Sequence, residues 1–345
     1  MNLLLLETIT GGGIAPADLP VSLLREGEAM VQAIASDLAM TAGIQLAVFR
    51  TPMLGTLEAM DRSLTLIEID SRETLKMKLR ELGAAGAWLW LIAPESDGEL
   101  LHFARLFTSA GGQLASPLPS SIALASSKHA TAELLRSRGI PAIPGTQVLP
   151  GETIHLPHAG PVMLKPDDGC GSQGLRLLEA AAARVFRHRS TGALRAEPLY
   201  EGIAASVAVI AGPRGLTPLV PCTQQLAKDG SFVYLGGSLP IPEDLSSRAQ
   251  LLALRAVEAV PEPRGYFGVD LLLDARPSES DQPRGDYVVE INPRLTTSYV
   301  GLRHRYRTNL AEATLRAVAG EQITLEERDV RVEFDSCGQV SIQEV

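Results

Sequence analysis

The chain has 345 residues, of which 45% are hydrophobic and 21% are charged, and its formal net charge is -9. This length predicts a globular protein with two or three packed subdomains rather than one compact core. The negative charge argues against nucleic acid or an anionic membrane as a partner, and no apolar run approaches the length that spans a bilayer. The cysteines, Cys170, Cys222 and Cys337, are few and far apart. They favour neither a disulfide framework nor a thiolate metal site, and we expect a cytoplasmic protein.

The first 120 residues alternate between short apolar runs and helical patterns. Strands are expected at Leu3–Leu6, Gln45–Phe49, Thr65–Ile69 and Ala87–Ile92, and helices at Val21–Ala42 and Glu73–Leu82. The opening run lacks basic residues, so we interpret it as a buried strand rather than a signal peptide. The alternation predicts an open parallel sheet. Gly12 and Gly13, after the first strand, either approach a phosphate or small substrate or form a tight turn, and the sequence leaves both open.

The middle of the chain combines a lysine with a glycine-rich loop. A strand is expected to end at Lys165, and a loop with Gly169, Gly171 and Gly174 follows it. A dinucleotide-binding fingerprint would need a helix to open at this loop, but Leu175–Leu178 has the pattern of a strand. This strand–loop–strand favours a flap that closes over nucleotide phosphates, with Lys165 as a point charge. The alternative is a plain glycine-rich hairpin with a surface lysine.

Two apolar strands near the C-terminal end carry acidic residues that are expected to meet. If 268–274 and 287–292 pair as a hairpin in which Asp274 faces Asp286, Asp270 faces Glu290. Alternation then places Asn292 on the same face as Glu290. Two carboxylates and an amide oxygen suit Mg²⁺, which binds through oxygen ligands and substrate phosphates. The alternative is a hairpin with surface acids.

Lysines are rare in this chain, so those close to glycines are candidates for phosphate binding. There are five of them, and Lys128, Lys165 and Lys228 fall where a phosphate site is conceivable. Serines before Lys128 and Gly139 after it predict a helix between them. Lys228 precedes Asp-Gly, so it is either a charge stabiliser or part of an exposed turn.

The order of these motifs resembles the ATP-grasp superfamily of carboxylate–amine ligases. The matching residues are Lys128, the phrase Lys165-Pro-x-x-Gly-x-Gly-x-x-Gly, Glu197, Asp270 and Glu290-x-Asn292-Pro-Arg294. The resemblance implies an α/β protein: a Rossmann-like N-terminal domain (1–120), then an ATP-grasp fold of two α+β subdomains. The first of these, 121–196, would carry the glycine-rich flap, and the second, 197–345, the magnesium site.

The resemblance also implies roles for individual residues. ATP would be bound by Lys128, Lys165, Gly169, Gly171, Ser172, Gly174, Glu197, Pro198, Leu199 and Glu201. Glu197 and Leu199 would contact adenine, and Asp270, Glu290 and Asn292 would hold two Mg²⁺ or Mn²⁺ ions. Arg294 would steady the transferred phosphoryl group and the acyl phosphate, and our own hypothesis, apart from the resemblance, adds Lys228 as a charge stabiliser. From their positions rather than from the resemblance, Gly12 and Gly13 after the first strand, and Ser298, Tyr299 and Arg303 just past the metal motif, are expected to line the substrate pocket.

Two positions depart from the superfamily pattern. Many members carry a ribose-binding glutamate where this chain has Ala204, and an arginine where it has Gly268. The ribose contact and one phosphate contact are therefore not assigned, although Glu201 lies close to the first position.

A narrower resemblance extends over nearly the whole chain. The sequence segments 7–13, 92–98, 234–240 and 290–303 resemble those of the tyramine–glutamate ligase family. Such ligases join glutamate to tyramine through an acyl phosphate, in the synthesis of methanofuran-type one-carbon cofactors. The alternatives are another amino-acid or dipeptide ligase of the superfamily and an ATP-binding module without turnover. The expected partners are a small carboxylate and a small amine as substrates. The sequence also allows a homodimer but does not establish one.

Overall fold

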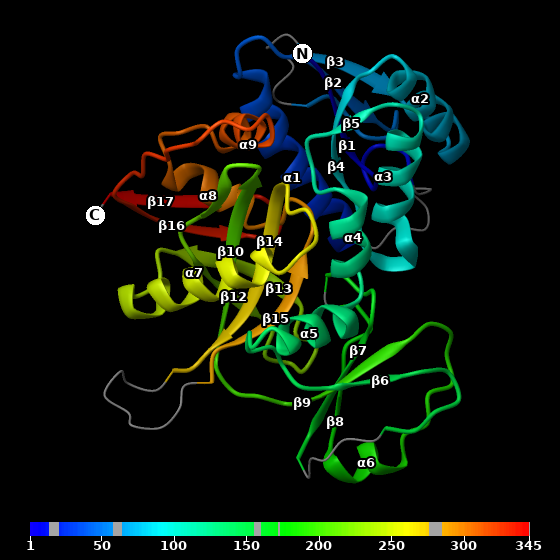
Figure 1. Cartoon of the computed structure of the whole chain (residues 1–345), viewed down its shortest axis with the longest axis vertical. Coiled ribbons are helices and arrows are strands. Elements are labelled where there is room, and N and C mark those ends of the chain that lie inside the picture. Colours follow the sequence, from blue (N-terminus) through cyan, green and yellow to red (C-terminus); the bar gives the residue numbers. More distant parts are fainter. Residues whose placement is uncertain (14–20, 58–63, 155–159, 172, 276–284, 345) are drawn as a thin grey trace.

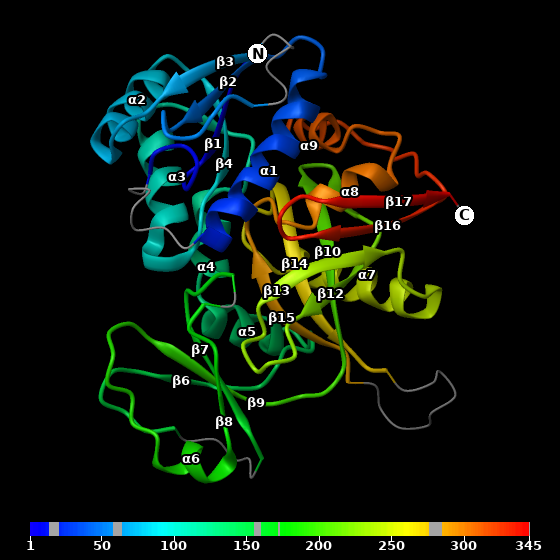
Figure 2. The ribbon, with the colours of Figure 1, turned by 180° about the vertical axis from the view of Figure 1, so that it is seen from behind.

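Three β-sheets form the framework of the protein in the computed structural model, which describes residues 1–13, 21–57, 64–154, 160–171, 173–275 and 285–344 (Figure 1). The N-terminal sheet and the small sheet that contains β6–β9 lie at opposite ends of the molecule, and the largest sheet lies between them. The reverse view shows α1 running along the side of the N-terminal sheet towards the central one (Figure 2). None of the helices in the described ranges combines the length and hydrophobicity that a bilayer crossing requires.

The N-terminal sheet is parallel throughout, as the β/α alternation predicts. Its described strands follow the order β3-β2-β1-β4-β5. They are β1 (Asn2–Glu7), β2 (Gln45–Arg50), β3 (Leu64–Glu68), β4 (Trp88–Ile92) and β5 (Gln113–Leu114), and the helices are α1 (Val21–Ala39), α2 (Arg72–Ala84), α3 (Glu99–Ser109) and α4 (Pro119–Ala125). Leu3 and Leu5 pack in the same core as α1, whereas Leu4 and Leu6 pack with α2 and α3. The leucine run is continuous because both faces of the sheet are covered.

The small sheet carries the predicted flap. Its described strands, in the order β6-β9-β7-β8, are antiparallel. They are β6 (Thr146–Val148), β9 (Leu194–Pro198), β7 (Val162–Pro166) and β8 (Arg176–Leu178), and α6 (Ala180–Val185) packs on them. Helix α5 (Lys128–Ser137) precedes this sheet and packs against the core of the central sheet. The strand–loop–strand prediction is confirmed, because β7 and β8 pair on either side of the glycine loop and α6 begins only after β8.

The central sheet follows the order β15-β14-β10-β12-β13-β16-β17 over the described residues, with β11 also paired to β10. The strands are β10 (Ile203–Gly212), β11 (Gly215–Pro218), β12 (Cys222–Leu226), β13 (Tyr234–Leu239), β14 (Gly265–Leu273), β15 (Tyr287–Asn292), β16 (Val330–Asp335) and β17 (Val340–Glu344). Helix α7 (Glu243–Glu258) packs on one face. Helices α8 (Tyr299–Arg305) and α9 (Leu310–Val318) pack on the other face, in the core that they share with α1.

The β14–β15 hairpin brings the predicted acids together but departs from the predicted register further along. Asp270 lies opposite Glu290, as predicted. Beyond this pair Leu271 faces Val288, so Val289 is an extra residue that the simple alternation did not include. The predicted pairing of Asp274 with Asp286 is therefore shifted. Instead, Asp286 Oδ1 accepts a hydrogen bond of 2.8 Å from the backbone N–H of Asp274.

Candidate functional site

A cavity of about 310 Å³ is lined by residues from the flap, the central sheet and α1. Most of the residues that the sequence singles out line it: Lys128, Lys165, Gly169, Gly171, Glu197, Pro198, Leu199, Asp270, Glu290, Asn292, Arg294 and Ser298. Residues that are far apart in the chain, from Glu26 to Ser298, therefore share one cavity. This convergence makes it the candidate active site.

The two lysines lie in the cavity, each paired with a carboxylate. Lys128, the first residue of α5, lies 2.8 Å from Glu290 Oε2 through its Nζ, which also donates to the carbonyl oxygen of Gly169. Lys165 Nζ lies 2.6 Å from Glu197 Oε2. Burial opposes the charge of Lys128, but Glu290 raises its pKa above the ordinary value. The Lys128 ammonium therefore stays positive in a largely buried site, and phosphate oxygens can replace the present carboxylate partners of both lysines.

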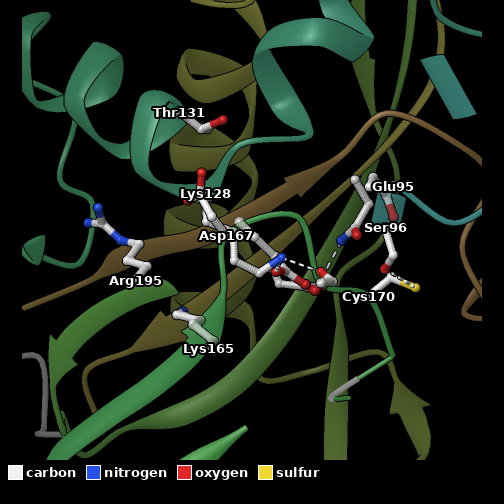
Figure 3. A network of polar contacts seen from close by, with 12 residues as sticks. Glu95, Ser96, Lys128, Thr131, Lys165, Asp167, Cys170 and Arg195 are labelled. Carbon is white, nitrogen blue, oxygen red and sulfur yellow. Dashed lines mark hydrogen bonds and ion pairs between the residues drawn. The ribbon is translucent and has the colours of Figure 1, made fainter. Parts of the chain in front are cut away.

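Asp167 links the start of α5 to the end of β7. Its Oδ1 accepts a 2.7 Å hydrogen bond from the backbone N–H of His129, and its Oδ2 accepts one of 2.7 Å from Ser127 Oγ. Its carbonyl oxygen accepts from the N–H of Lys128. Figure 3 shows Asp167 between Lys128 and Lys165. One buried side chain thus fixes where Lys128 begins its helix relative to the strand that carries Lys165.

Asp270 and Glu290 form a pair of facing carboxylates. Gln224 donates to Asp270 Oδ1 at 2.9 Å and Asn292 donates to Oδ2 at 3.1 Å. Burial and the adjacent Glu290 raise the pKa of Asp270 to about 7. Burial opposes the ionisation of Glu290 as well, but Lys128 and Lys165 lower its pKa to about 2. Two like charges this close are costly without a cation, and oxygen donors of this kind suit Mg²⁺.

Arg294 is paired with an acid from the loop that follows β4. Its Nε donates to Glu95 Oε1 at 3.0 Å, and this carboxylate raises the pKa of Arg294 although burial opposes the charge. The next residues contact the flap: Asp97 N–H donates to Asp168 Oδ2 at 2.8 Å, and Ser96 Oγ donates to Cys170 Sγ at 3.6 Å (Figure 3). The loop after β4 therefore contacts both Arg294 and the flap.

Several predicted site residues lie off the cavity lining. Gly12, Gly13, Gly174, Glu201, Lys228, Tyr299 and Arg303 are the described residues in this group, and Ser172 lies outside the described residues. Gly12 has a φ of 81° and a Cβ there would meet Ile69, which agrees with the tight-turn alternative. Lys228 is exposed in the turn between β12 and β13, in agreement with the exposed-turn alternative.

Tyr299 and Arg303 contact α1 instead of the cavity. The hydroxyl of Tyr299 donates to Asp37 Oδ2 at 2.6 Å, and Arg303 donates to both oxygens of Asp37. The structure therefore corrects the expectation that both side chains line a substrate pocket. Leu199 does line the cavity, but its N–H donates to the carbonyl oxygen of Pro161 at 3.0 Å, so a hydrogen bond from Leu199 N to adenine requires that contact to open.

Sequence reasoning missed several polar residues around the site. Arg195 is fully buried and donates from Nε to Glu197 Oε1 at 2.6 Å. Arg195 stands two residues before Glu197 in a strand, so alternation places both side chains on one face. This spacing could have predicted the pair from the sequence. Asp167 follows Lys165 within the flap motif and was equally visible. Gln224 and Glu26 carried no sequence signal, because they become functional candidates only through contacts between distant segments.

The comparisons with known proteins agree with this geometry. A family model described as an ATP-grasp domain matches residues 125–298, half of the chain. The tyramine–L-glutamate ligase of Methanocaldococcus fervens is 27% identical over 162 residues, which are 47% of this chain and 46% of that protein. The corresponding ligase of Methanocaldococcus jannaschii is 28% identical over 139 residues, 40% of this chain and 41% of that protein. The chain thus spans about half the length of the curated relatives it matches.

Solved structures support the same fold. A crystal structure described as an ATP-grasp superfamily protein of Archaeoglobus fulgidus has a TM-score of 0.67 at 24% identity, and the match covers 96% of this chain and 91% of that chain. An L-amino acid ligase of Bacillus licheniformis has a TM-score of 0.63 at 14% identity, over 96% and 78% of the two chains. With a family model over half of its length and this fold over nearly all of it, the chain belongs to the ATP-grasp family.

Proposed function

We propose that the protein is an ATP-dependent carboxylate–amine ligase that forms an amide bond and releases ADP and phosphate. The observation that carries this proposal is the convergence of Lys128 and Lys165, the Asp270–Glu290 pair and Arg294 on one cavity. Cations beside a carboxylate pair suit a triphosphate with its metal ion, and Arg294 next to them suits a developing negative charge.

In this proposal the flap and its neighbours bind ATP. Lys128 and Lys165 exchange their present carboxylate partners for phosphate oxygens, and the loop with Gly169 and Gly171 approaches the phosphates through backbone N–H groups. The predicted contributions of Ser172, Gly174 and Glu201 belong to the same proposal. The adenine would lie beside Glu197, Pro198 and Leu199, which line the cavity.

The acidic end of the cavity fits Mg²⁺ or Mn²⁺, and we propose two ions there. Asp270, Glu290 and Asn292 would hold them, because their oxygens are the donors that such ions prefer. The raised pKa of Asp270 supports this assignment, since a cation between the carboxylates would remove the repulsion that favours its protonation. When bound, the ions supply charge neutralisation to the triphosphate.

The reaction needs positioning rather than a nucleophilic side chain. A substrate carboxylate oxygen bonds to the γ-phosphorus as the bond to ADP breaks, which gives an acyl phosphate. The neutral amine nitrogen then bonds to the acyl carbon and phosphate leaves with the electron pair of the broken C–O bond. The nitrogen gives one proton to the departing phosphate or to solvent and keeps the other as the amide N–H. Arg294 stabilises charge in both steps, and the flap, in contact with Ser96 and Asp97, limits access of water.

We propose L-glutamate and tyramine as the substrates, in the synthesis of a methanofuran-type one-carbon cofactor. Support comes from the similarity to two tyramine–L-glutamate ligases and from the four sequence segments that resemble that family. Phe232 and Tyr234 line the cavity and offer aromatic surface to a phenol ring.

The test is the release of ADP from ATP and Mg²⁺ with L-glutamate plus tyramine, compared with each substrate alone, with the amide identified by mass spectrometry. We expect ADP and amide in equal amounts only when both are present. A second panel tests other amino acids and other amines. If ADP is released with one of these pairs but not with L-glutamate and tyramine, the proposed substrates are wrong and the proposed ligase activity is retained. ATP binding without ADP release from any pair contradicts the ligase and favours a binding module.

A further inference from the structure

Helix α1 contributes a carboxylate to the cavity that the ATP site does not use. Glu26 lines the cavity together with Arg294 and Thr297, although it comes from the N-terminal part of the chain. Its Oε2 accepts a 3.3 Å hydrogen bond from Thr297 Oγ1. Burial raises the pKa of Glu26, while Arg294 and Thr297 oppose that shift, so the side chain lies close enough to Arg294 to feel its charge.

The other carboxylates of the cavity are accounted for by ion pairs or by the proposed metal site, to which Asp270, with Gln224 and Asn292 as its donors, belongs. Glu197 pairs with Lys165 and Arg195, and Glu290 pairs with Lys128. Arg294 is already engaged by Glu95 at 3.0 Å. Over the described residues, Glu26 has no ion pair, and its hydrogen bond comes from a neutral hydroxyl. A half-buried carboxylate without a cation is costly unless something binds to it.

Aromatic side chains from β12–β13 lie on the same cavity. Tyr234 lines the cavity with Glu26, and that carboxylate contributes to the raised pKa of Tyr234 after the larger effects of burial, Cys222 and Asp270. Phe232 has a φ of 54°, in a region that bulky residues rarely adopt, and it lines the cavity. A conformation of this kind costs free energy, and it occurs at binding sites as well as in turns such as this one between β12 and β13.

We propose that Glu26, with Phe232 and Tyr234, forms the subsite for the amine substrate: Glu26 binds the ammonium group and the two rings contact an aryl or apolar body. The inference rests on the proposed ligase function and narrows its acceptor to primary amines of the arylalkylamine class. Arg294 beside Glu26 is where the acyl group is proposed to lie. Once the bound ammonium has given one proton to the Glu26 carboxylate or to solvent, the neutral nitrogen is close to the carbon that it attacks.

The kinetic test compares E26Q with the wild-type protein, using ATP, L-glutamate and tyramine. Glutamine keeps the size of the side chain and an oxygen that accepts from Thr297 Oγ1, but it removes the negative charge that would bind the ammonium group. The KM for tyramine should therefore rise roughly ten- to hundredfold. The KM values for ATP and L-glutamate should stay within about twofold, the spread of a neutral substitution. The exposed Glu243, in the first turn of α7, gives the matched control: E243Q removes the same charge and should change none of the three.

A neutral analogue separates charge recognition from shape. The alcohol 2-(4-hydroxyphenyl)ethanol carries a hydroxyl in place of the amine, and calorimetric titration of it and of tyramine needs no turnover. Wild-type protein should prefer tyramine by about tenfold or more, and E26Q should lose that preference. F232L should weaken the binding of tyramine more than that of n-butylamine, because only the former has a ring to contact.

The outcomes distinguish the inference from the ligase function. An active wild-type protein with an unchanged KM for tyramine in E26Q overturns the subsite and leaves the ligase intact. A rise in the KM for L-glutamate alone also overturns it, since Glu26 would then bind the ammonium of the acid. If no pair of acid and amine gives ADP, the proposed ligase function is wrong. The calorimetric titration still tests the subsite in that case, because equal affinity of the wild-type protein and E26Q for tyramine would overturn it.

Discussion

At the scale of single residues, charge pairing determines what the cavity can bind. Lys128 and Lys165 are paired with Glu290 and Glu197. A phosphate can replace the carboxylate beside each lysine, and a metal ion can replace the lysine beside Glu290. Glu290 is the residue that both functions share. It faces Asp270 on the metal side and Lys128 on the phosphate side.

Replacement of Glu290 by alanine should abolish most turnover while the protein stays folded. The variant loses a metal ligand and the partner of Lys128, so the rate of ADP release should fall by about three orders of magnitude or more. Circular dichroism should remain that of the wild-type protein, because loss of the Lys128 ion pair is partly offset by relief of the repulsion with Asp270. Near-normal turnover in this variant would refute the metal assignment.

Glu7, at the end of β1, should make stability depend on pH. Burial raises its pKa to about 7, although the N–H groups of Thr10 and Ile9 oppose the shift. An unfolded glutamate ionises near its ordinary value, so the protonated folded form stabilises the protein fully below about pH 4.5, and this contribution is lost as pH rises towards 7. The change amounts to about 3 kcal/mol.

The comparison of E7Q with wild-type protein isolates this effect. Glutamine does not ionise, so the free energy of unfolding of E7Q, measured in urea at pH 5 and pH 8, should fall less with pH than that of the wild-type protein. Parallel pH profiles for the two proteins would show that Glu7 stays ionised when folded.

At the scale of elements, patterns within one strand predicted more than contacts between strands. The parallel strands of the N-terminal sheet follow from apolar runs, and the β7–β8 flap follows from its lysine and glycines. The facing of Asp270 and Glu290 followed from counting residues along a hairpin, but the count failed at Val289 because a bulge adds one residue without a sequence signal. The link from Asp167 to α5 could not be predicted, since it depends on tertiary contacts.

Asp167 should therefore act as a positioning residue for Lys128. D167A removes the acceptor for His129 N–H and for Ser127 Oγ, so the start of α5 is no longer tied to β7. The Kd for ATP, measured by calorimetry, should rise about tenfold, while binding of tyramine stays unchanged. D167N keeps an oxygen for His129 N–H and should restore much of the affinity. Equal loss in both variants would indicate that the negative charge, rather than the position of α5, is what matters.

At the scale of the whole molecule, α1 joins the N-terminal sheet to the central sheet. Its residues share a core with α8 and α9, and Asp37 accepts hydrogen bonds from Tyr299 and Arg303. The carbonyl oxygen of Asp37 also accepts from Asn309 at 2.7 Å. Because Glu26 lies on the same helix, this contact sets where the proposed amine subsite stands relative to Arg294.

Removal of the Asp37 side chain should weaken this junction more than removal of one of its donors. D37A leaves the buried Tyr299 hydroxyl and the Arg303 guanidinium without their acceptor, which should cost about 3 kcal/mol of unfolding free energy. Y299F removes one hydroxyl and leaves Arg303 on Asp37, so it should cost about 1 kcal/mol. Urea unfolding measures both. The KM for L-glutamate in Y299F separates the two roles considered for Tyr299: a junction residue leaves it within about twofold while stability falls. A large rise in KM at unchanged stability would return Tyr299 to the substrate pocket that the sequence suggested.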